Sequence, residues 1–234
     1  MATLAERVQT PTGAGGGDAE DTIHRLIGWV QAHRQATSYA VVALVVAAAL
    51  VWWNLLASRR AEEAAGDQLR QARIAFEQEN YPLAASEFAR IRENYSGSRA
   101  AEQATLLLAQ TRLLQGQGQQ AVDVLEGFSR SASSAYRAQA FGLLGAGYEN
   151  LGNAARAAEA FEAAAGATDF PSLRAQFLSD AGRAWVTAGD TAKAVAAYQR
   201  ILRDLSVTGS APEATVRLGE LTKGAAAIPA PKEE

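Results

Sequence analysis

Few residues of this 234-residue chain have the chemistry of a catalytic or metal site. It has no cysteine, which excludes disulfides, thiolate metal ligands, a cysteine nucleophile and a lipidated-cysteine anchor. The two histidines, His24 and His33, stand nine residues apart without a carboxylate at ligand spacing, and both precede the apolar segment described below. No Gly-x-Ser-x-Gly or His-Glu-x-x-His string occurs. We therefore expect no catalytic residue, no metal site and no cofactor, and we interpret the chain as not an enzyme.

The remaining charged clusters are better explained as protein surface. Glu62 and Glu63 are adjacent acids, but neighbouring side chains on a helix point about 100° apart, so we expect a solvated face rather than an acid–base dyad. Arg90, Arg92 and Arg99 form a basic cluster that nearby glutamates balance, which indicates surface ion pairs rather than a phosphate site. The net charge of −3 gives no long-range attraction to nucleic acid.

The segment 39–57, YAVVALVVAAALVWWNLLA, has no formal charge. As a helix it is about 28 Å long, close to the roughly 30 Å hydrocarbon core of a bilayer. Trp52 and Trp53 are aromatic residues of the type enriched at membrane–water interfaces. The side chains of Arg59 and Arg60 can extend from the bilayer into water. We interpret this segment as a transmembrane helix. The alternatives are a buried core helix and a cleaved signal peptide, although 38 residues precede it.

The residues before the span predict an amphipathic helix. An apolar stripe with helical spacing is formed by Ile23, Leu26, Ile27 and Val30. Over residues 21–38 we therefore expect an amphipathic helix at the membrane interface, with a short helix packed on a partner as the alternative. Residues 1–20 and 223–234, rich in small residues and proline, are expected to be disordered tails.

After the span the sequence repeats with a period of 36 or 37 residues. A small residue recurs in register at Ala84, Ala121, Ala157 and Ala194. Four positions after each stands a bulky apolar residue, namely Phe88, Leu125, Phe161 and Tyr198. Twelve positions before each stands a second small residue, in the series Ala72, Ala109, Gly145 and Gly182 that continues at Gly219.

This pattern predicts helix hairpins. The upstream small residues let the first helix of each hairpin (helix A) approach its neighbour, and Gly116, Gly152 and Gly189 break the chain before the second helix (helix B). Each hairpin buries one face and needs the next hairpin to cover the other, so the hairpins stack into a solenoid. We expect residues 211–222 to form a final helix A over the last open face.

The third and fourth units resemble the tetratricopeptide repeat. The third carries LLGAGY at 143–148 and the fourth carries Ala181-Gly182 followed by Trp185. The first two units match less well, because Arg112 stands where a bulky residue is usual and Ser96 where proline is usual. The predicted fold is therefore all-α, with one transmembrane helix followed, over residues 58–222, by a tetratricopeptide-like solenoid of about four and a half helix hairpins.

With the anchor and the repeats in this order, residues 21–222 resemble the YfgM-like ancillary subunits of the Sec translocon. The similarity includes the span ending in VWWN and the repeat segments NYPLAASEF and GDTAKAVAAY. It implies a single-pass protein of the bacterial inner (cytoplasmic) membrane, with the N-terminus cytoplasmic and the repeat domain periplasmic. It also implies translocon subunits and periplasmic chaperones as neighbours.

The charges that flank the span favour the opposite orientation by one residue. Arg25 and Arg34 precede the span, whereas Arg59, Arg60 and Arg70 follow it, so the positive-inside rule favours a cytoplasmic C-terminus. We follow the resemblance, because long domains cross membranes largely regardless of flanking charge.

A track of polar residues gives the candidate binding site. In this repeat class helix A lines the concave groove, and the residues that would face it by register are Gln103, Gln110, Gln139, Glu149, Asn150, Gln176 and Arg183. Unpaired amides with one acid and one arginine suit an extended peptide, whose backbone supplies donors and acceptors. The alternative is that they are solvated surface residues.

Two functions are consistent with these features. The first is a membrane-anchored protein–protein interaction scaffold that holds extended client peptides or chaperones near the translocon, where tethering raises the local concentration. The second is a self-associating structural organiser of the cell envelope, a homo-oligomer that forms through the span or the repeats. With inverted topology the chain would be an adaptor facing the cytoplasm. We expect neither a nucleic acid nor a small-molecule substrate.

Overall fold

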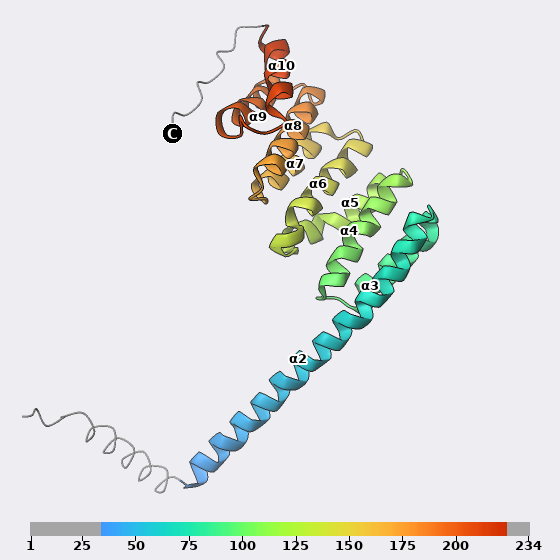
Figure 1. The fold of residues 1–234 in the computed structure, drawn as a ribbon, viewed down its shortest axis with the longest axis vertical. Helices are drawn as coiled ribbons and strands as arrows, with labels where there is room; N and C mark the ends of the chain where they lie inside the picture. The colour runs from blue at the N-terminus through green and yellow to red at the C-terminus, as the bar shows by residue number, and fades with distance from the viewer. Residues whose placement is uncertain (1–33, 224–234) are drawn as a thin grey trace, which may run out of the picture. The chain divides into compact units, whose positions relative to one another are not determined.

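The computed structural model describes residues 34–223, and in this part of the chain all regular elements are helices (Figure 1). These are α2 Arg34–Glu77, α3 Tyr81–Asn94, α4 Arg99–Leu114, α5 Gly118–Ser131, α6 Ser134–Asn150, α7 Ala154–Gly166, α8 Pro171–Thr187, α9 Thr191–Asp204 and α10 Ala211–Thr222. The all-α prediction is confirmed. The predicted tail 1–20, nearly all of the predicted amphipathic helix 21–38, and residues 224–234 lie outside the described residues.

The chain divides into two compact units, Met1–Ala57 and Ser58–Glu234. In the first unit, the described side chains from residue 42 to residue 57 are all exposed. Trp52 and Trp53 are 71% and 72% exposed, although large aromatic side chains are normally well buried in a soluble protein. Among the described residues, α2 from Val42 onward is the helix that is long and apolar enough to cross a membrane, and its apolar 18-residue stretch has a mean hydropathy of 1.7.

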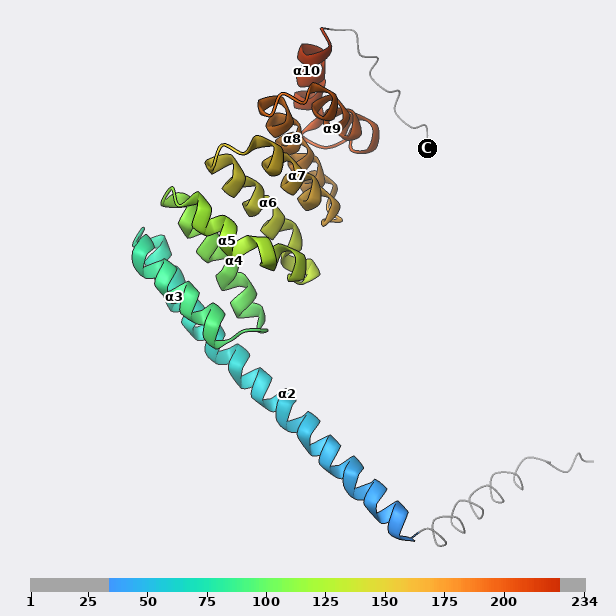
Figure 2. The same ribbon diagram turned by 180° about the vertical axis from the view of Figure 1, so that it is seen from behind.

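The second unit is a row of helix hairpins followed by a single helix (Figure 2). The end of α2 pairs with α3 through the rings of Phe76 and Phe88, whose centroids lie 6.3 Å apart. The next hairpins are α4 with α5, α6 with α7, and α8 with α9, and α10 follows alone. This arrangement confirms the predicted number of about four and a half hairpins, and the first of them begins within α2 itself.

Each hairpin turns through one residue in the left-handed region of the backbone. Gly116, Gly152 and Gly189 have φ angles of 71°, 71° and 82°, so the predicted helix breaks are confirmed. The first hairpin turns instead at Glu79, with φ 59°, where a side chain is strained and glycine is not. The sequence pattern missed this turn because it contains no glycine.

The recurring small residues face the recurring bulky ones. A β-carbon on Gly145 would lie 2.7 Å from the ring of Phe161, which is closer than carbon atoms approach without displacement. Ala72 and Phe88, at the equivalent positions of the first hairpin, are 1% and 0% exposed. Helix A can therefore lie close to helix B in each hairpin because its contact residue is small.

The last helix covers the open end of the final hairpin, as the sequence predicts. Ala214 and Leu218 of α10 are fully or almost fully buried. They belong to the same apolar cluster as Tyr198 and Ile201 of α9. A solenoid needs such a terminal helix, since its end hairpins otherwise expose an apolar face.

Glutamate side chains on one helix A accept hydrogen bonds from backbone groups at the start of the next helix A. The carboxylate of Glu62 accepts hydrogen bonds from the backbone N–H groups of Arg99 and Ala100 at 2.9 and 3.1 Å. These groups begin α4, where the first N–H groups of a helix have no partner within it. Glu102 similarly accepts from the N–H of Ser133, just before α6, at 2.8 Å. The expectation that Glu62 is only solvated is therefore wrong.

Candidate partner-binding groove

The seven residues of the predicted polar track lie on three consecutive A helices. Gln103 and Gln110 are on α4, Gln139, Glu149 and Asn150 on α6, and Gln176 and Arg183 on α8. Gln103, Gln110 and Glu149 are half-buried and the other four are exposed. Helix α4 packs against α6, so the track residues of these two helices lie on neighbouring helices.

An ion pair joins two members of the track across neighbouring helices. The Nη1 atom of Arg183 on α8 lies 2.6 Å from Oε1 of Glu149 on α6. Arg183 also donates to Asp180, one turn earlier on its own helix, at 3.2 Å. Its hydrogen bond to Glu149 is the main reason that the pKa of Arg183 is raised. This contact fixes the position of the guanidinium between α6 and α8.

Asp180 belongs to the site although the sequence prediction omitted it. Burial raises the pKa of its carboxyl group, and the negative charges of Glu149 and Glu213 act in the same direction, against the opposing effect of Arg183. Two acids thus share one arginine, and Arg183 is needed to neutralise them.

The amides of the track are free to bind a ligand. Within residues 34–223 the side chains of Gln103, Gln110, Gln139 and Gln176 make no hydrogen bond to another group. Each amide offers a carbonyl acceptor and two N–H donors. The side chain of Asn150 likewise makes no hydrogen bond within these residues, and its β-carbon lies at the start of α5, where it would be 2.9 Å from a β-carbon on Gly118.

A pocket of about 170 Å³ lies at the C-terminal end of the track, among α8, α9 and α10. Arg183 and Val186 of α8 line one side, and Arg217 and Leu221 of α10 line another. Val186 is 44% exposed, so it offers apolar surface beside the two guanidinium groups. The pocket therefore combines hydrogen-bond donors with an apolar wall, as ligand-binding pockets commonly do.

The ring of Tyr198 and the pair formed by Arg217 and Glu220 complete this pocket. Arg217 Nη1 lies 3.2 Å from Glu220 Oε2. Burial raises the pKa of the Tyr198 hydroxyl above its ordinary value of 10. These α10 residues were not among the predicted track residues, although Glu220 stands one 37-residue repeat after Arg183 and the period itself could have located it.

The chemistry of this surface is hydrogen bonding and charge pairing. Among residues 34–223, no three histidine, aspartate or glutamate side chains are grouped so that they could hold a metal ion. The residues present can bind backbone amides and charged side chains of a polypeptide.

Comparison with known proteins identifies the class of fold. Two solved structures of a Podosopora anserina putative kinesin light chain with nearly identical TPR-like repeats, one of them a single-residue variant, each give a TM-score of 0.55. Each is 18% identical in sequence, and the alignment covers 70% of this chain and 87% of that chain. No protein-family model and no curated protein matches. The chain therefore has a fold of tetratricopeptide-like helical repeats.

Proposed function

We propose that this chain is a non-catalytic, membrane-anchored scaffold that binds other proteins through the polar track and the pocket at its C-terminal end. The observation that carries the proposal is the row of unbonded glutamine amides on α4, α6 and α8 beside a fixed arginine. An extended peptide has unpaired backbone donors and acceptors, so such a row suits it. Tethering to a membrane raises the local concentration of the site and compensates for weak individual contacts.

The anchor in this proposal is the segment 39–57. Support comes from the length of α2 and from the side chains of residues 42–57, which are all exposed. Following the YfgM-like resemblance, we place the chain in the bacterial inner membrane with the repeats in the periplasm. Translocon subunits, chaperones and extended client segments are then the expected partners.

Site-directed photocrosslinking in intact cells tests the binding surface. A photoreactive residue replaces Gln176 on the track, and the matched control replaces Glu159, which is exposed on α7 and outside the track. We expect crosslinks to other proteins from position 176 and far fewer from position 159. Equal crosslinking at the two positions would contradict the track as the binding site.

The same crosslinks separate the two candidate functions. Products with translocon subunits or chaperones support the scaffold, whereas products of the chain with itself alone support the self-associating organiser. A reporter fused after Glu234 tests the orientation independently. A cytoplasmic signal would contradict the periplasmic role and support the cytoplasmic adaptor.

A further inference from the structure

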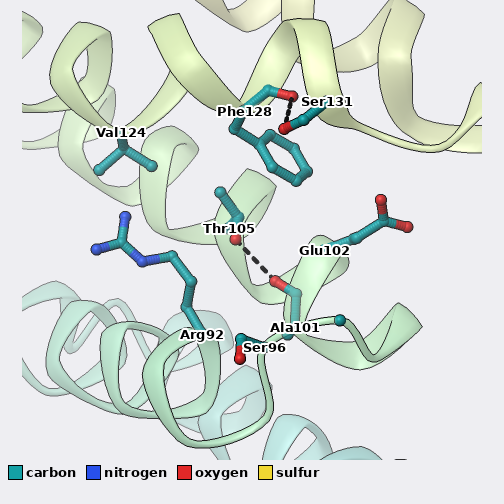
Figure 3. Close-up of a pocket in the computed structure, with 9 residues that line it drawn as sticks. Arg92, Ser96, Ala101, Glu102, Thr105, Val124, Phe128 and Ser131 are labelled. Carbon is teal, nitrogen blue, oxygen red and sulfur yellow. Dashed lines mark hydrogen bonds between the residues drawn. The ribbon is translucent and has the colours of Figure 1, made fainter.

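A second pocket, of about 290 Å³, lies where α3, α4 and α5 meet (Figure 3). None of the seven track residues lines it. The connection between α3 and α4, residues 95–98, is longer than the connection between α5 and α6, residues 132–133. It contributes Ser96 and Gly97 to the lining, and these small residues leave the space unfilled.

Arg92 supplies an unpaired positive charge to this pocket. It is half-buried at the end of α3, and in Figure 3 its guanidinium points toward Val124 of α5. Within residues 34–223 it makes no hydrogen bond and no ion pair, whereas Arg90, two residues earlier, pairs with Glu87. The predicted patch of surface ion pairs therefore includes Arg90 but leaves Arg92 available.

Glu102, Thr105 and Ser131 of the lining already make hydrogen bonds. Glu102 lies on the side of the pocket away from Arg92 in Figure 3, and its carboxylate accepts from the N–H and the hydroxyl of Ser133, both at 2.8 Å. Thr105 donates its hydroxyl to the carbonyl of Ala101 at 2.8 Å. Arg92 is thus the charged residue of this lining whose N–H donors have no acceptor in the described part of the chain.

The wall next to Arg92 is apolar. Val124 and Phe128 of α5 are both half-buried and line the pocket. Burying an apolar group on them is favourable, and a carboxylate beside it would pair with the guanidinium in a partly dry site. The volume is near the lower limit of about 300 Å³ for ligand pockets, so it has room for one residue-sized group.

We propose that this pocket binds a bulky apolar group that carries a carboxylate, in the form of the C-terminal residue of a partner polypeptide. Arg92 binds the carboxylate, and Val124 and Phe128 contact the apolar side chain. This site is separate from the polar track, so one copy of the chain can hold two segments at once. Because the two sites share no residue, a result that contradicts one does not contradict the other.

Methyl NMR of the full chain in detergent micelles tests the pocket. The probe is N-acetyl-L-phenylalanine, and the control ligand is its C-terminal amide, which has the same ring without the charge. The reporter is the methyl pair of Val124. The internal control is Val122, which is 2% exposed and lies against Gly147 instead of the pocket.

We expect the acid to shift the Val124 signals in a saturable way and to leave Val122 unchanged. Arg92→Gln should weaken this binding at least about tenfold, since a hydrogen bond to a charged group is lost. The matched variant Arg90→Gln should bind normally. Equal binding of the amide, no saturable shift at millimolar acid, or unchanged binding by Arg92→Gln would each overturn the proposal.

Two further arms identify the ligand class. Inorganic phosphate should not shift Val124 at the concentration at which the acid saturates, and an equal response would mean a simple anion site and overturn the proposal. A short peptide ending in Phe-COOH should bind, and the same peptide with two residues added after the Phe should not. Equal binding of both peptides would overturn the assignment to a C-terminal residue.

Discussion

The hydroxyl of Tyr148 on α6 donates a hydrogen bond of 2.6 Å to the carboxylate of Glu126 on α5. The same oxygen of Glu126 accepts from Arg156 on α7 at 2.6 Å. The guanidinium carbon of Arg156 also lies 4.2 Å from the centroid of the Tyr148 ring. One aromatic residue thus connects three consecutive helices through an acid on one side and a cation on the other.

The next repeat has the same arrangement with different residues. The indole N–H of Trp185 donates to Glu162 at 2.8 Å, and Lys193 Nζ lies 3.9 Å from the centroid of the Trp185 ring. In the second hairpin Arg112 stands in place of the aromatic residue, and its guanidinium donates to the side chain of Gln117 at 2.8 Å instead. In the third and fourth hairpins the aromatic residue of helix A therefore contacts both the helix before it and the helix after it. The second hairpin has no such aromatic contact.

Acid should weaken the connection through Glu126. Its pKa lies below the ordinary 4.5, because Tyr148 and then Arg156 donate hydrogen bonds to the carboxylate. A lowered pKa in the folded state means that the contribution to stability is complete above pH 4.5 and is lost as pH falls through the folded-state value. Denaturant unfolding should show that Glu126→Gln destabilises the protein at pH 7 and destabilises it less at pH 3. An equal effect at both pH values would contradict this assignment.

The close contact in the fourth hairpin should not tolerate a methyl group. A β-carbon on Gly182 would lie 2.6 Å from the Tyr198 ring, so Gly182→Ala must displace the ring. Overpacking of this kind costs about 1–3 kcal/mol, against a gain of up to about 1 kcal/mol in helix propensity. Thermal unfolding should show a net loss of stability. Gly127→Ala on α5 is the control, because nothing lies within 4 Å of its β-carbon, and it should be neutral or stabilising.

The sequence predicts those features of the structure that arise from contacts within one hairpin, and it does not predict those that depend on how the hairpins stack. The period, the small residues and the turn glycines act within one hairpin, so the pattern predicts the hairpins and the closing helix. The turn at Glu79 was missed because a glutamate gives no sign of a left-handed conformation. The role of Glu62 was missed because its partners begin the next helix A, and their distance depends on how the hairpins stack. Both pockets likewise depend on spaces between helices.

A missing helix cap predicts a stabilising substitution. Asn80, Asn153 and Asp190 precede the B helices and accept a hydrogen bond from the N–H three residues later. Gln117 occupies the same place before α5 and makes no such bond. Gln117→Asp should stabilise the protein by about 0.5–1 kcal/mol. The loss of the hydrogen bond that Gln117 accepts from Arg112 reduces this gain.

The reverse change is the control for the cap. Asn153→Gln should cost about 0.5–2 kcal/mol, since it removes a cap that exists. Both variants can be compared by the midpoint of denaturant unfolding. If Gln117→Asp were destabilising while Asn153→Gln had no effect, the cap would not explain the difference between these turns.

Removing the carboxylate of Glu62 should loosen the stacking of the first two hairpins. Glu62→Ala removes two hydrogen bonds to the start of α4 and should cost about 1 kcal/mol. Hydrogen exchange at Arg99 and Ala100 should increase more than elsewhere in α4. Glu63→Ala, at an exposed position next in the chain, should change stability by less than about 0.5 kcal/mol. Equal effects of both substitutions would show that Glu62 has no special role.

Exchanging the charges of Arg183 and Glu149 separates the stability of the groove from its binding. Arg183→Gln leaves Glu149 and Asp180 without their shared cation, and ion pairs as open to solvent as Arg183 is contribute only about 1 kcal/mol, so the loss of stability should be small. The double change Arg183→Glu with Glu149→Arg keeps a pair between α6 and α8 but moves the positive charge away from the pocket. If Arg183 binds partners, both variants should reduce crosslinking from position 176 several-fold while the melting temperature stays close to that of the unchanged chain. Undiminished crosslinking in both would mean that Arg183 only connects two helices, and partner binding would then have to rest on the glutamine amides.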